Sequence, residues 1–133
     1  MTIRIATLLC FGLLLGQSMS VVATTFDEDE FTLLELDYKR HTIMGGLESY
    51  IKKDDIYILL IDLVSALELD ITVETDVATG YLDSENSTFS LEHNIDGWFL
   101  SIDETTEKIN EDDIVIHESL LYVKHTQIEK WFD

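Results

Sequence analysis

The sequence predicts an α+β domain that consists mostly of antiparallel β-hairpins with two short amphipathic helices. An apolar, strand-like run at residues 56–60 passes directly into a helical pattern at residues 60–67. Residues 120–132 repeat this order of an apolar strand and a short amphipathic helix. Between the two units, residues 78–94 have the turn and the alternation of a β-hairpin. The repetition predicts a duplicated strand–helix arrangement around that hairpin.

Residues 1–23 are typical of a secretory signal peptide and lie outside the predicted domain. Arg4 supplies a short positive region, residues 5–15 are apolar, and a cut is expected after Ala23. An uncleaved membrane anchor is the alternative, but polar residues within positions 17–20 weaken it, because a spanning helix needs about 20 mainly apolar residues. We therefore expect the mature chain in the periplasm, the outer membrane or the extracellular space, with no membrane span.

The charge of the chain limits its partners. It carries 27 acidic and 8 basic residues, a formal net charge of −19. Such a surface repels nucleic acid and anionic lipid, so nucleic-acid binding is excluded and cations or basic partners are favoured. The single cysteine, Cys10, lies in the leader, and the mature chain is therefore predicted to have no disulfide. This pattern favours a bacterial envelope protein with a self-sufficient core.

The predicted domain, residues 31–133, has the length of one domain and not of two. A mostly acidic lead-in at residues 24–30 precedes it and is predicted to be mobile. Residues 31–39 alternate in polarity, as in a strand with one exposed face. The glycine pair at residues 45–46 predicts a turn or a bulge, because glycine adopts positive φ without strain. A short extended segment follows at residues 47–51.

Further turns and strands separate the larger units. Residues 52–55 are a polar turn, and residues 71–74 alternate as a strand that leaves the first helix. Residues 96–97 form an Asp-Gly turn before another strand at residues 98–102. Residues 104–113 are mostly polar and predict a loop with a short extended stretch.

Three parts of the sequence resemble a known module. The strand at residues 56–60 with the helical segment that follows is similar to the copper amine oxidase N-terminal-like domain. The hairpin at residues 80–91 is closer to a variant of that domain found at the start of large exported proteobacterial proteins that resemble fimbrial ushers. Residues 121–123 and 131–132 fit the closing unit of this variant. Leu59 stands where the family usually has proline.

The resemblance covers residues 31–133 and implies a non-catalytic accessory region. It implies no copper site, because the copper of amine oxidases is bound by a different domain. The apolar aromatic pair at residues 131–132, directly before the last residue, further predicts that the chain is truncated or is the first module of a longer protein.

A metal site has only weak candidates in this sequence. Asp83, Glu85 and Asn86 place oxygen ligands close together, as Ca²⁺ requires, but the glycine and the final glutamate of an EF-hand loop are missing. The acidic residues 111–113 are equally unspecific. A copper or zinc site would need histidines brought together by the fold, since their spacing matches no metal motif. These histidines are His41, His93, His117 and His125.

No catalytic motif is recognisable, so the chain is predicted not to be an enzyme and to hold no cofactor. A G-x-S-x-G elbow is missing, and with 27 acids a pair of carboxylates carries no specific signal. Trp98 beside Gly97 is the candidate for stacking on a sugar, whereas the other aromatic side chains are expected in the core.

The predicted function is therefore that of a non-catalytic accessory or protein-interaction module of an exported cell-envelope protein. It would contact a protein partner or downstream domains of the same polypeptide. The alternative is an envelope module that binds a glycan or Ca²⁺.

Overall fold

The computed structural model describes residues 2–5, 26–38, 41–82 and 86–132, which form two antiparallel sheets and two α-helices. The α+β, mostly β class is thereby confirmed. The first sheet contains β1 (Thr2–Ile5), β2 (Phe31–Tyr38), β3 (His41–Lys52), β4 (Asp55–Leu59), β10 (Ile114–His117) and β11 (Leu120–Lys124). Its strand order is β1-β2-β3-β4-β11-β10.

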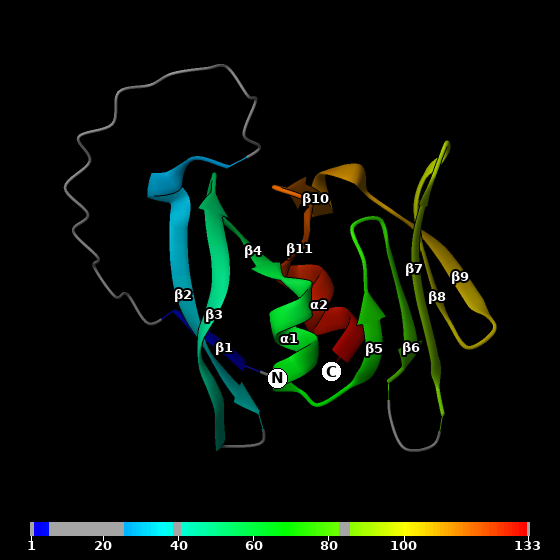
Figure 1. The fold of residues 1–133 in the computed structure, drawn as a ribbon, viewed down its shortest axis with the longest axis horizontal. Coiled ribbons are helices and arrows are strands. Elements are labelled where there is room, and N and C mark those ends of the chain that lie inside the picture. Colours follow the sequence, from blue (N-terminus) through cyan, green and yellow to red (C-terminus); the bar gives the residue numbers. More distant parts are fainter. Residues whose placement is uncertain (1, 6–25, 39–40, 83–85, 133) are drawn as a thin grey trace.

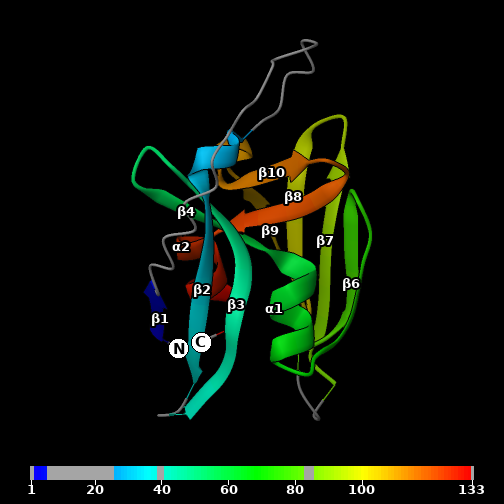
Figure 2. The same ribbon diagram turned by 60° about the vertical axis from the view of Figure 1, so that its left-hand side comes forward.

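The second sheet is a meander whose strands pair in the order of the chain. It contains β5 (Asp70–Val73), β6 (Val77–Tyr81), β7 (Thr88–Asn94), β8 (Gly97–Ile102) and β9 (Thr105–Ile109). Helices α1 (Leu60–Ala66) and α2 (His125–Phe132) lie between the two sheets, as Figures 1 and 2 show. Short 3₁₀ helices are found at η1 (Glu28–Glu30) and η2 (Glu111–Asp113).

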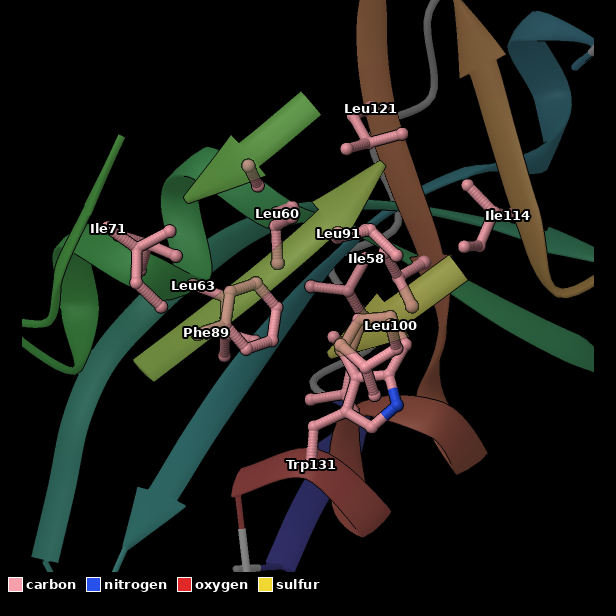
Figure 3. Packing of buried hydrophobic residues seen from close by; sticks show 14 of the residues in the cluster. Ile58, Leu60, Leu63, Ile71, Phe89, Leu91, Leu100, Ile114, Leu121 and Trp131 are labelled. Carbon is pink, nitrogen blue, oxygen red and sulfur yellow. The ribbon is translucent and has the colours of Figure 1, made fainter. Parts of the chain in front are cut away.

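One apolar core fills the space between the helices and the two sheets (Figure 3). Burial of each large side chain stabilises the fold by about 1.5–3 kcal/mol. The phenyl ring of Phe89 lies 5.9 Å from the indole of Trp131, so the second sheet packs directly on α2. The labelled core side chains are Ile58, Leu60, Leu63, Ile71, Phe89, Leu91, Leu100, Ile114, Leu121 and Trp131.

Both helices continue directly from strands of the first sheet, β4 into α1 and β11 into α2. These two strands are neighbours, and Ile58 of β4 lies opposite Val123 of β11. The predicted apolar face of the first helix is confirmed, because its side chains are buried or pack against the core. They are Leu60, Leu63, Val64 and Leu67.

The predicted central hairpin is confirmed as β6 and β7, with Tyr81 opposite Thr88. Residues 83–85 of its turn lie outside the described part of the chain. The polar turn between β3 and β4 is also confirmed: Lys53 and Asp54 both have positive φ, as a tight two-residue hairpin turn requires.

The glycine pair forms a bulge in β3. Leu34 of β2 lies opposite Leu47, but Glu35 lies opposite Gly45, so Gly46 is the extra residue. Gly46 has a φ of +91°, which glycine adopts without strain. The bulge leaves Leu34 and Leu47 facing the core together, and both are fully buried.

The structure adds to or corrects the sequence-based expectations in three places. Residues 105–109 are a full strand, β9, rather than part of a loop, because pairing with β8 satisfies the backbone of this polar segment. Strand β10, which the sequence analysis does not assign, pairs with β11. In the predicted lead-in, Phe26 is only 2% exposed and η1 follows it, while the acidic side chains stay at the surface.

Candidate functional site

A small groove opens between the two sheets at the corner where β4 passes into α1. Its volume is about 180 Å³. Its walls come from the β4–α1 corner, the end of β5 and the turn between β10 and β11. We call it the apolar groove, and its lining residues are Leu59, Ile61, Val73, Glu74, Thr75, Ser119, Leu120 and Leu121.

The local backbone explains why two large apolar side chains stand at the surface of this groove. Ile61 lies on the first turn of α1, beside the buried Leu60, and is 43% exposed. Leu120 follows a tight turn in which Glu118 and Ser119 have positive φ, and it is 39% exposed. The apolar groove therefore presents side chains that the fold itself does not bury.

A hydrogen bond between the sheets holds the groove in shape. The Thr75 hydroxyl, beyond β5, donates to the carbonyl oxygen of Ser119 at 3.2 Å. On the far side of α1, the Asp62 carboxylate accepts from the backbone N–H of Glu48 in β3 at 3.2 Å. Of the described residues that line the groove, Glu74 is the one with a charge.

A second, larger groove of about 570 Å³ lies on the first sheet near η2. Lys124 is one of the cations that line it, with its Nζ atom 3.2 Å from Asp55 and 3.5 Å from Asp113. The hydrogen bond that Lys124 donates to the Asp55 carboxylate raises the pKa of Lys124. The Tyr57 hydroxyl donates to the carbonyl oxygen of Asp112 at 2.8 Å, and burial raises the pKa of Tyr57. The acids and bases of this groove neutralise one another, which disfavours binding of a simple ion.

Aromatic rings gather on the face of the first sheet that is turned away from the helices. Phe26 stacks on Tyr50 with 4.6 Å between ring centroids and 6° between planes. The ring of Phe26 also lies 5.4 Å from Tyr57, 5.4 Å from Tyr122 and 5.2 Å from His117. We call these four partners of Phe26 the aromatic pocket. Burial raises the pKa of Tyr122. Burial also raises the pKa of Tyr50, and nearby carboxylates raise it further by a smaller amount.

The predicted sugar-binding residue is placed differently from the expectation. Trp98 is only 5% exposed and belongs to the apolar core. His93, directly opposite on β7, stacks on the indole at 4.6 Å. The prediction that Trp98 forms a sugar platform is therefore wrong, since packing and not solvent covers its faces.

The calcium candidates are only partly described. Asp83 and Glu85 lie outside the described residues, and Asn86 is exposed with a φ of 64°. Among the described residues, no group of three or more histidine, cysteine, aspartate or glutamate side chains is placed to hold a metal ion.

The histidines are dispersed rather than assembled. His117 is buried in the aromatic pocket, and His93 is exposed beside Trp98. His125 begins α2, and its buried Nδ1 atom has no hydrogen-bond partner. The side chain of His41 lies outside the described part.

Comparison with known protein families, curated proteins and solved structures finds no match for this chain. Within the described ranges, each helix is too short or too polar to cross a membrane.

The apolar groove is not predicted by the amino-acid sequence. One signal was present: Ile61 lies beside Leu60, outside the apolar face that the helical spacing defines. The exposure of Leu120 has no comparable local signal, because a leucine at the start of an apolar strand is expected in the core.

Proposed function

We propose that this chain is a non-catalytic protein-contact module of an exported cell-envelope protein, as the N-terminal part of an usher-like or other surface assembly. The leader at residues 1–23 supports export. The resemblance of residues 31–133 to the copper amine oxidase N-terminal-like domain supports an accessory role. The observation that carries the proposal is the apolar groove.

Single exposed apolar side chains are common on protein surfaces and need no explanation. Here Ile61 and Leu120 line one groove whose floor includes the apolar residues Leu59 and Leu121. Exposed apolar groups that converge on a concave site are typical of a contact surface. The partner we propose places an apolar side chain between Ile61 and Leu120, which removes both from water.

The negative charge of the chain determines which charged groups the partner should carry beside its apolar side chain. Glu74 lines the groove, and the whole chain carries a formal charge of −19. A partner with basic groups beside its apolar residue is therefore attracted, whereas an acidic partner is repelled.

The duplicated arrangement is a further part of the proposal. The hairpin β3–β4 leads into α1, and the hairpin β10–β11 leads into α2. The two inner strands, β4 and β11, pair antiparallel in the centre of the first sheet. This order supports an origin from two copies of one hairpin–helix unit, with the second sheet inserted between them.

Site-specific photo-crosslinking in the exporting cell tests the function. A photoreactive residue at Leu120 is expected to crosslink to a partner protein, and Ile61→Asp is expected to suppress that product. A photoreactive residue at Ile95 is the matched control, because Ile95 is fully exposed at the β7–β8 turn and lies outside the apolar groove. Equal products from both positions, or a chain found only in the cytoplasm, would contradict the proposal.

A further inference from the structure

One edge strand of the first sheet, β1, belongs to the predicted leader. β1 runs antiparallel beside β2, at the edge of the sheet (Figure 2). Ile3, Arg4 and Ile5 of β1 lie opposite Leu36, Glu35 and Leu34 of β2, in that order. Removal of residues 1–23 takes β1 away and leaves β2 as the edge strand of the described sheet.

We propose that the edge of β2 at residues 34–36 is a binding site for an extended segment of a partner protein, which pairs with β2 in the place of β1. The inference rests on the export that the proposed function includes. The edge of a sheet presents backbone N–H and C=O groups that attract a further strand. Addition of such a strand is a recurring mode of peptide recognition.

The pairing of β1 with β2 shows that this edge of the sheet can pair with a further strand. β2 is eight residues long and its pairing with β3 extends from Phe31 to Tyr38, so the strand is held on its inner side. The buried Leu34 fixes β2 against the core. A partner strand therefore meets a rigid edge and adds only its own ordering cost.

The register of β1 also indicates the chemistry of the partner. Glu35 is exposed, and the residue opposite it in β1 is the base Arg4. Opposite charges on paired strands stabilise the pair, and like charges destabilise it. The expected segment has a basic residue opposite Glu35 and apolar residues at the neighbouring positions. A second copy of β2 is disfavoured, because it would bring the acids Glu35 and Asp37 of two chains together.

The test uses the protein as the exporting cell processes it, and begins with sequencing of its N-terminus. A synthetic peptide of residues 1–7 is then added, and amide hydrogen exchange of residues 34–36 is followed. Exchange at these residues is expected to slow several-fold with the peptide. The same peptide N-methylated at alternate residues is the control, because it cannot complete the ladder of hydrogen bonds.

A charge swap tests the pairing with Glu35. A peptide with Arg4→Glu is expected to bind about fivefold more weakly, the factor that corresponds to roughly 1 kcal/mol for a cross-strand charge pair. The variant Glu35→Lys is expected to reverse this preference and to favour the Arg4→Glu peptide. Glu104→Lys in the exposed β8–β9 turn is the matched control and should leave the preference unchanged.

Three outcomes would overturn the inference. The first is unchanged exchange at residues 34–36 up to the solubility limit of the peptide, and the second is equal protection by the N-methylated peptide. The third is an exported chain that keeps residues 1–23, since β1 would then occupy the edge permanently. If, in the absence of peptide, protection of residues 34–36 rises with protein concentration, the segment that pairs with β2 is a second copy of this chain and not a partner protein. None of these results changes the crosslinking expected at Leu120, which tests the contact function separately.

Discussion

Replacement of Phe26 by alanine tests whether the segment before β2 belongs to the folded unit. Phe26 is 2% exposed and makes ring contacts with all four members of the aromatic pocket. Truncation of a buried phenylalanine typically costs about 3–5 kcal/mol. Phe26 lies near the chain end that cleavage after Ala23 would create, so its backbone can relax. We therefore expect the lower value, about 3 kcal/mol.

This loss is large for a domain of this size. A change of 1 kcal/mol shifts Tm by about 4 °C or slightly more for a chain of roughly 100 residues, so Phe26→Ala should lower Tm by roughly 12 °C. Chemical unfolding followed by tryptophan fluorescence measures the same change as a free energy, because Trp98 and Trp131 are both buried in the core.

Phe31→Ala is the matched control. Phe31 is 44% exposed, and its ring meets the Tyr50 ring edge-on with 5.5 Å between centroids, so about 1 kcal/mol is expected. If Phe26→Ala costs no more than Phe31→Ala, the N-terminal segment contributes nothing to the fold. The mobile lead-in that the acidic run predicts would then be correct after all.

Three further predictions concern stability. Gly80→Ala should cost at least 2 kcal/mol in chemical unfolding, because the added Cβ would overlap the Asp70 carbonyl and lie 2.6 Å from the Cα atom of Ile71. The control Gly46→Ala, at an open site, should cost about 1 kcal/mol through the positive φ of Gly46. Equal costs for the two variants would contradict the predicted clash. Lys124→Met should cost about 1 kcal/mol or less, and the difference from wild type should disappear as pH rises through the raised pKa of Lys124, as urea unfolding at several alkaline pH values would show. In the folded state the tyrosines of the aromatic pocket have raised pKa values, so the stability they contribute is fully present below their ordinary pKa of about 10. As pH rises above about 10, the unfolded chain ionises first, and unfolding should become easier. A Tm that is unchanged between about pH 9 and pH 11 would refute this prediction.

Local patterns in the sequence were sufficient for much of the secondary structure. The helix of residues 60–66 was found because its apolar side chains recur at helical spacing. The β6–β7 hairpin was found because polar turn residues separate two alternating segments. β9 was missed because its five residues, Thr105–Ile109, include one buried apolar side chain, and without an apolar alternation a strand resembles a loop.

Candidate sites were harder to predict, because exposure depends on the whole fold. Trp98 beside a glycine turn suggested an accessible ring, but the strand that follows the turn directs the indole into the core. Leu120 suggested a core position, but it is the first residue of β11, next to a turn, and is 39% exposed. A sequence pattern defines which face of an element is apolar, but it does not define what lies against that face.

The amino-acid sequence by itself determined the α+β class, the apolar face of α1 and the central hairpin, since each depends on residues close together in the chain. Only the tertiary structure decided that β4 pairs with β11, that Phe26 fills the aromatic pocket and that Ile61 and Leu120 share a groove. These features depend on contacts between segments far apart in sequence. Their free energy comes from burial and strand pairing that no local pattern encodes.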